Sequence, residues 1–215
     1  KKRKAFHILN RLDVVGGELN AYTTKEETVL YASVLNTHAD RAIEIIADIT
    51  FNSTFPAHEL EKEKDVVIDE ILSYQDAPSE LIFEDFDNLL FKGHSLGNDI
   101  LGTEEDVKKI TREKVQAFVN KHYVPQNMVI SSVGNFSLKQ VVKKISKYFE
   151  EFQGEITVKT DLKEASSSQF TQSVQKETHQ AHVIIGNSAC AYGHKDKTAL
   201  VLLNNYLGGP AMNSR

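Results

Sequence analysis

The chain of 215 residues is 40% hydrophobic, which is enough to bury a core and to hold one domain with part or all of another. Its 25 basic and 30 acidic residues give a net charge of -5, and no basic stripe or arginine-rich patch suited to nucleic acid stands out from that balance. The single cysteine, Cys190, excludes an intrachain disulfide and a CxxC zinc site, and no apolar run reaches the roughly 18 residues that span a bilayer. We therefore expect a globular protein that binds neither nucleic acid nor a membrane.

The chain opens with the pattern of a helix followed by a hairpin. Apolar residues at helical spacing over residues 5–12 stop near Gly16-Gly17, where two glycines permit the backbone geometry of a helix end. Residues 18–23 and 28–35 are rich in Tyr, Val, Leu and Thr and flank a short polar segment. This arrangement predicts two antiparallel strands joined by a turn.

A layer of helices is expected after the hairpin. Thr37 and Asp40 have the spacing of a capping box, which predicts the start of a helix whose core-facing residues are Ala42, Ile45, Ile46 and Ile49. Residues 60–71 form a charged, proline-free run that also has helical spacing of its apolar residues, and residues 82–90 predict a further amphipathic helix.

The middle of the chain predicts a loop, two short helices, a strand and a longer helix. The glycine-rich residues 93–102 indicate the loop, and Thr103 and Thr111 are expected to be the N-caps of the short helices. Residues 128–133 form an apolar run typical of a buried strand. The amphipathic pattern of residues 138–149 predicts a helix.

A change of composition marks the best candidate for a domain linker. Residues 155–171 are rich in Lys, Glu, Ser and Thr, whereas beyond them residues 181–189 predict a strand and residues 197–207 a helix. We therefore divide the chain into a first unit of residues 1–154, a linker, and the start of a second unit at residues 172–215. Because the first residues open directly on a helical pattern and the last lie in a loop, we expect a fragment of a longer protein.

Two glutamates stand out on the helix predicted around residues 60–71. Seven residues separate Glu63 from Glu70, so they lie within roughly 20° of each other around the helix and about 10 Å apart along its axis. Because Val67 and Tyr74 share that side, we expect the two carboxylates to face packed protein, where they need a cation or hydrogen-bond donors. The pair is a candidate metal or catalytic site. The alternative is a solvated charged helix on which neighbouring lysines pair with the acidic residues.

Several short motifs, each weak alone, occur in the order and spacing of one known family. They are Gly16-Gly17-Glu18-Leu19-Asn20-Ala21-Tyr22-Thr23, Glu63-Lys64-Asp65-Val66-Val67-Ile68-Asp69-Glu70, His94-Ser95-Leu96-Gly97, Tyr123-Val124-Pro125-Gln126-Asn127-Met128 and Leu203-Asn204-Asn205-Tyr206-Leu207-Gly208-Gly209. On these segments the chain resembles the pitrilysin/insulinase-type zinc metallopeptidases, the inverzincins that include mitochondrial processing peptidase and its bacterial relatives. The resemblance implies an α+β fold of two layers, in which an antiparallel-rich sheet packs against helices. One unit of this repeated fold would be followed by the start of the next.

The resemblance also implies a zinc site to which this chain contributes only part. The family holds zinc with two histidines of an HxxEH helix, whose glutamate is the general base, and with a third ligand from a downstream glutamate. Glu70 matches that metal ligand, and Glu63 matches the companion glutamate that supports catalysis. Neither HxxEH nor HExxH occurs in the 215 residues. In relatives the motif lies shortly before the segment that resembles residues 1–12.

The resemblance therefore implies a fragment of a zinc-dependent endopeptidase that cleaves peptides, or unfolded or presequence segments, and that is inactive without its HxxEH segment. Asn20 and Ala21 match the strand on which the family binds an extended peptide, although from the residues alone an interior strand remains an alternative. A second alternative is a non-catalytic homologous subunit or scaffold that binds peptide and supports a catalytic partner, and a third is a plain peptide-binding module. We expect the intact protein to form a homo- or heterodimer. We also expect it to be cytoplasmic, with the periplasm and the mitochondrial matrix as alternatives.

Overall fold

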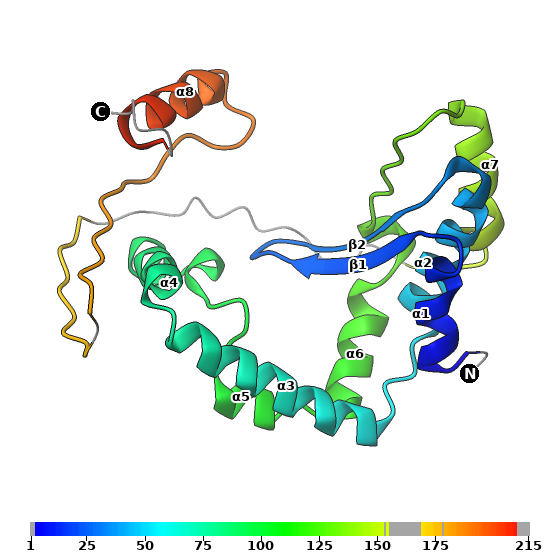
Figure 1. Ribbon diagram of the computed structural model, residues 1–215, viewed down its shortest axis with the longest axis horizontal. Coiled ribbons are helices and arrows are strands. Elements are labelled where there is room, and N and C mark those ends of the chain that lie inside the picture. Colours follow the sequence, from blue (N-terminus) through cyan, green and yellow to red (C-terminus); the bar gives the residue numbers. More distant parts are fainter. Residues whose placement is uncertain (1–2, 153, 155–168, 178, 210–215) are drawn as a thin grey trace. The chain divides into compact units, whose positions relative to one another are not determined.

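Figure 1 shows a computed structural model of the chain, which describes residues 3–152, 154, 169–177 and 179–209. The chain divides into two compact units, one of residues 1–76 with 98–163 and the other of residues 77–97 with 164–215. Both units are rich in helix, and the first contains a two-stranded antiparallel sheet. The α+β fold class is thereby confirmed. The boundary proposed at residues 155–171 stays a prediction, because most of that segment lies outside the described residues.

The first unit contains the hairpin and most of the helices. Its elements are α1 (Ala5–Asp13), β1 (Glu18–Thr23), β2 (Thr28–Ser33), α2 (Ala39–Asn52), α3 (Ala57–Gln75), α5 (Glu104–Lys108), α6 (Arg112–His122) and α7 (Leu138–Phe149), with single 3-10 turns at Asn36–His38 and Pro125–Asn127. The described part of the second unit contains α4 (Pro78–Leu90), a 3-10 turn at Ser95–Gly97 and α8 (Lys197–Gly208). None of these helices is long and apolar enough to cross a bilayer.

The core of the first unit lies where α1, α2 and the hairpin meet. Leu12 and Ile45 are completely buried there, and Ala42 beside them is almost so. Gly17 lies against this core, because a Cβ atom at that position would be 2.5 Å from Cγ1 of Val34. Only glycine therefore lets the chain pass from α1 into β1 this close to its neighbours. The first helix and the hairpin agree with the sequence predictions. On α2, Ala42 and Ile45 are buried and Ile49 packs against them as predicted, whereas Ile46 is only partly buried.

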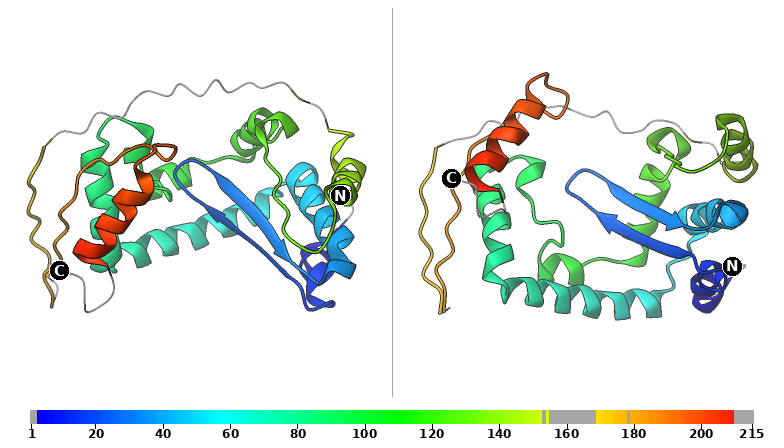
Figure 2. Two further views of the ribbon diagram at one scale, coloured as in Figure 1. Left: turned by 90° about the horizontal axis from the view of Figure 1, so that it is seen from above. Right: turned by 45° about the horizontal axis from the view of Figure 1, so that its top comes forward.

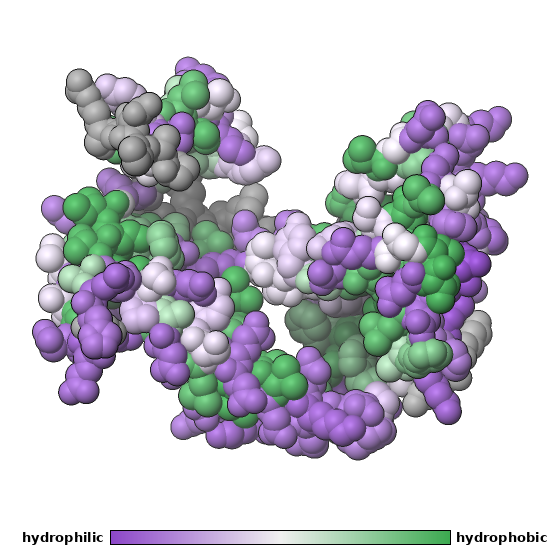
Figure 3. All heavy atoms as spheres, in the orientation of Figure 1, coloured by the Kyte–Doolittle hydropathy of each residue, from purple (hydrophilic) through white to green (hydrophobic). Residues whose placement is uncertain are grey.

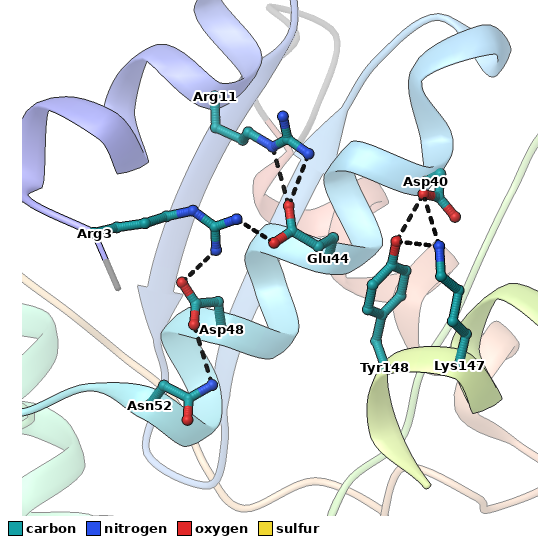
Figure 4. A network of polar contacts seen from close by, with 8 residues as sticks. All are labelled: Arg3, Arg11, Asp40, Glu44, Asp48, Asn52, Lys147 and Tyr148. Atoms are coloured by element: carbon teal, nitrogen blue, oxygen red, sulfur yellow. Dashed lines mark hydrogen bonds and ion pairs between the residues drawn. The ribbon is translucent and has the colours of Figure 1, made fainter. Parts of the chain in front are cut away.

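Helix α7 packs on α2 through aromatic and polar contacts. Phe149 meets Phe51 edge to face, with ring centroids 5.5 Å apart, and Figure 4 shows Tyr148 and Lys147 pointing at Asp40. The predicted role of Asp40 in a capping box with Thr37 is wrong. A 3-10 turn precedes α2, whose N-cap has no side-chain hydrogen bond, so the Asp40 carboxylate is free to accept hydrogen bonds from α7 instead.

Side-chain hydrogen bonds cap the N-termini of α5, α6 and α7. The hydroxyls of Thr103 and Thr111 accept hydrogen bonds from backbone N–H groups of the first turns of α5 and α6, as expected of N-caps. Ser137 and Gln140 form a complete capping box at the start of α7, a feature beyond the amphipathic pattern that predicts this helix.

The strands predicted at residues 128–133 and 181–189 are absent from the described residues. Val129 and Val133 are 93% and 99% exposed, and Val183 and Ile185 are 82% and 94% exposed. In the part of the chain that is described, β1 and β2 form the one strand ladder. An apolar run becomes a strand only when a neighbouring backbone satisfies its N–H and C=O groups, and neither run has such a neighbour here.

Candidate functional site

Helix α3 carries both glutamates that the sequence singled out. Their spacing on a continuous helix from Ala57 to Gln75 puts the two carboxylates on one side, about 10 Å apart along the axis. Both Glu63 and Glu70 are exposed, and Figure 3 shows mostly hydrophilic residues over the outer surface along α3. Among the described residues, neither glutamate forms a hydrogen bond or an ion pair. The acidic residues that do pair on this helix are Glu59 and Glu61, with Lys62 and Lys64.

The prediction that Glu63 and Glu70 face packed protein is wrong. The buried side of α3 is centred on Ile71 and on Lys64, whose side chain is only 13% exposed. These two residues are also seven apart, and each glutamate is rotated from them by about 100° around the axis. Val67 lies between the buried side and the side of the two glutamates. Its position near the glutamates therefore does not bury them, and both carboxylates are open to solvent or to a ligand.

A second candidate region is the outer edge of the hairpin. In the register of the two strands Asn20 faces Tyr31 and Ala21 faces Leu30. The Ala21 N–H donates a 2.8 Å hydrogen bond to the side-chain oxygen of Asn20. An N–H group occupied in this way does not donate to the paired strand, so it points to the outer edge of β1.

No third strand lies along the edge of β1 in the described part of the chain (Figure 2). Asn20 and Ala21 are both exposed there. An open edge presents unpaired backbone donors and acceptors, which can bind an extended peptide as an added strand. Within this edge, the Asn20 side chain satisfies the Ala21 N–H while no peptide is bound.

Two family models together match nearly the whole chain: "Insulinase (Peptidase family M16)" over residues 1–104 and "Peptidase M16 inactive domain" over residues 109–215. The chain belongs to the M16 peptidase family. The residues matched by the first model include α3 with both glutamates and the hairpin with its open edge.

Relatives and solved structures agree with this assignment. This M16 chain is 37% identical over 213 residues to an uncharacterized zinc protease of Bacillus subtilis, YmxG, a match that covers 99% of the chain and 51% of the relative. It is 29% identical to a probable mitochondrial-processing peptidase subunit beta of Arabidopsis thaliana, over 96% of the chain and 40% of the relative. A peptidase M16 inactive domain from Pseudomonas fluorescens shares the fold, with a TM-score of 0.77 at 17% identity over 99% of the chain and 52% of that structure. The chain thus spans about half the length of the curated relatives it matches.

The residues of this M16 chain fit one part of a zinc site. Catalytic zinc is ordinarily held by three protein ligands with a fourth position open. No group of three His, Cys, Asp or Glu side chains that could hold a metal ion occurs within the residues that the structure describes. The exposed carboxylate of Glu70 has no hydrogen-bond or ion-pair partner among the described residues, which leaves it available to a ligand. The described residues therefore do not form such a site by themselves, and Glu70 is one carboxylate that is available to a metal ion.

Sequence reasoning missed two residues that hold α3 in place. Only the alternative of a solvated helix gives Lys64 a role, as a pairing partner of an acidic residue, and no sequence pattern points to Arg112. The signal for Lys64 was present in the pattern, since it falls seven residues before Ile71 and four after Leu60, in register with the apolar side of the helix. For Arg112 the sequence offered no signal, because its partners are backbone carbonyls far away in the chain.

Proposed function

We propose that the protein containing this chain is a zinc-dependent endopeptidase, in which Glu70 is a zinc ligand and Glu63 a supporting catalytic residue. The observation that carries the proposal is the pair of exposed, unpaired carboxylates on one flank of α3, in a chain that is 37% identical to a named zinc protease. Two histidine ligands and the general base would come from an HxxEH segment outside these residues.

Within such a site the two glutamates have different tasks. A bound zinc ion would lower the pKa of its water and polarise the peptide carbonyl. Glu70 would hold the ion through a carboxylate oxygen. Glu63, two turns earlier on the same flank, would accept a hydrogen bond from a ligand or from the substrate and so keep it oriented. Because both residues belong to one helix, the spacing of their backbone positions is fixed before substrate arrives.

The outer edge of β1 is the proposed substrate-binding surface. An extended peptide would add to this edge, and the N–H of Ala21 would transfer its hydrogen bond from Asn20 to a backbone carbonyl of the peptide. Backbone hydrogen bonds of this kind do not read side chains, which suits peptides and unfolded or presequence segments as substrates. A homo- or heterodimer of the intact protein belongs to the same proposal, which is supported by the likeness to a processing-peptidase subunit.

A non-catalytic homologous subunit is the second candidate function. The observation that favours it is the match of residues 109–215 to a domain described as inactive, together with the lack of an HxxEH motif in the sequence. Such a subunit would keep the hairpin edge for peptide binding and support a catalytic partner. In that case, Glu70 would have no role in metal binding.

A comparison of this chain with a longer protein that includes the preceding residues tests the proposal. We expect the longer protein to contain HxxEH, to bind one zinc per chain and to cleave an unfolded protein in a chelator-sensitive reaction. The 215-residue chain should show no such activity, since a single carboxylate does not retain zinc against water and buffer. Preceding residues without HxxEH, or a longer protein that neither binds zinc nor cleaves, would favour the non-catalytic subunit.

A further inference from the structure

The connection between α5 and α6 holds α3 through the side chain of Lys64. The Lys64 ammonium lies 2.9 Å from the carboxylate of Glu61 and 3.4 Å from the backbone carbonyl oxygen of Lys108, at the end of α5. A lysine this deeply covered needs partners for its charge, and the last carbonyl of a helix is a favourable one. The position of Lys64 fixes the rotation of α3 about its axis. With Lys64 turned toward α5, Glu63 and Glu70 lie about 100° away around the helix.

The same connection also holds the start of α3. The guanidinium of Arg112 donates hydrogen bonds to the carbonyl oxygens of Thr54, at 3.2 and 3.3 Å, and of Phe55, at 2.9 Å. Phe55 has a φ of 44°, a left-handed conformation that costs an aromatic residue about 1–2 kcal/mol. A strained residue of this kind persists where its surroundings fix it, and here Arg112 does so.

The two contacts fix α3 at points that are separated along its axis. From the start of α3 at Ala57 to Lys64 the helix rises by about 10 Å. The segment from Lys108 to Arg112 can span up to about 14 Å when extended, so one short connection reaches both points. We call this arrangement, the contacts of Lys108 with Lys64 and of Arg112 with Thr54 and Phe55, the α5–α6 clamp.

We propose that Lys64 is a positioning residue for the site on α3: by binding the end of α5 it sets the rotation of the helix, and with it the direction of Glu63 and Glu70. This inference rests on the proposed function, since it assigns a task to the two glutamates. Arg112 sets where the helix begins, and Lys64 sets how it is turned. The hydrogen bonds and ion pairs that the structure describes for these two residues do not involve Glu63 or Glu70.

The test uses the longer protein with its HxxEH segment and compares two lysines of the same helix. Lys64→Met keeps the aliphatic packing and removes the charge. The control Lys62→Met removes an exposed lysine whose ion pair in the described part of the chain is with Glu59. We expect Lys64→Met to weaken zinc binding and to lower kcat by roughly 10-fold or more, as the loss of a supporting contact does, with little change in KM. Lys62→Met should behave like the parent. Lys64→Arg, which keeps a cation of sufficient reach, should restore both zinc affinity and kcat.

Hydrogen exchange provides a readout that is independent of zinc. If Lys64 anchors α3 to α5, the backbone amides of residues 104–110 should exchange faster in Lys64→Met than in Lys62→Met, and Lys64→Gln gives the same comparison if the methionine variant does not fold. Equal exchange, or zinc affinity and kinetics equal to those of Lys62→Met, would overturn the positioning role. A parent protein that binds no zinc would instead defeat the proposed function, and the exchange comparison would still decide whether Lys64 holds the helix.

Discussion

The Tyr148 hydroxyl on α7 donates a 2.7 Å hydrogen bond to the Asp40 carboxylate on α2, and Lys147 approaches the same oxygen at 3.4 Å. The hydrogen bond from Tyr148 is the main cause of the lowered pKa of Asp40; burial opposes it, and Lys147 adds to the lowering. The contact therefore couples the packing of α7 on α2 to the charge of one aspartate.

This coupling predicts how the stability of the first unit changes with pH. Because the folded-state pKa of Asp40 is lowered, its stabilising effect is complete above the unfolded value of about 3.9 and is lost as pH falls through the lowered pKa. The carboxylate is about half exposed, so we expect Asp40→Asn to cost less than about 1 kcal/mol at neutral pH. Urea unfolding at neutral pH and at about pH 3 should show the difference between parent and variant shrinking in acid. Tyr148→Phe should reproduce much of the loss, and a difference that is constant with pH would contradict this assignment.

The second prediction separates the tasks of the two glutamates in the longer, zinc-loaded protein. Glu70→Gln should lower zinc content and peptidase activity together, because a ligand is lost. Glu63→Gln should lower activity by roughly 10- to 100-fold with a smaller loss of metal, as expected of a supporting residue. Asp69→Asn is the matched control, since Asp69 is exposed on the same helix and points away from both glutamates. Zinc per chain is measured by elemental analysis. Full zinc retention in both glutamate variants would remove Glu70 as a ligand.

The third prediction concerns the start of α3. Arg112→Ala removes three hydrogen bonds from a charged donor to the carbonyls of Thr54 and Phe55, so we expect a loss of about 1–3 kcal/mol in the free energy of unfolding. Lys114→Ala is the control, because Lys114 lies on the same helix turn and donates to a single exposed carbonyl, that of Lys109. Chemical unfolding of the 215-residue chain measures both variants. If the two losses are equal, Arg112 does not hold the strained turn.

Local patterns predicted the helices and the hairpin, because the forces that define these elements act between residues close in sequence. The strands at residues 128–133 and 181–189 could not be judged in this way, since a strand exists only with a partner strand. The prediction that Glu63 and Glu70 face packed protein was wrong for a related reason. The partner of Lys64 on α5, the backbone carbonyl of Lys108, lies more than forty residues later in the chain, so no local pattern predicts the contact.

The candidate site also has one feature that local sequence predicts and one that it does not. Spacing alone placed Glu63 and Glu70 on one side of one helix, because helix geometry is local. Which way that side faces involves the contact of Lys64 with the carbonyl of Lys108, a residue that lies far from α3 in the sequence. The open edge of β1 likewise followed from the family resemblance and not from the strand's own residues.

The last prediction tests peptide binding at the edge of β1 in the longer, zinc-loaded protein. Ala21→Pro removes the N–H that is held by Asn20 at 2.8 Å and that the proposal assigns to the substrate backbone. Because this N–H points away from β2, the hairpin should keep its own hydrogen bonds and the protein should fold. We expect KM to rise at least several-fold or turnover to be lost, with zinc content unchanged at one per chain.

Ala21→Val is the matched control for this experiment, because valine keeps the backbone donor and favours a strand while adding bulk at the same position. If the N–H carries substrate binding, the valine variant should keep a KM much closer to that of the parent than the proline variant does. Circular dichroism and zinc content establish that both variants are folded and loaded. An Ala21→Pro protein that folds, binds zinc and cleaves peptides with the kinetics of the parent would show that substrate is held elsewhere. Equal losses in both variants would point to the space around Ala21, and not to its N–H, as the feature that substrate requires.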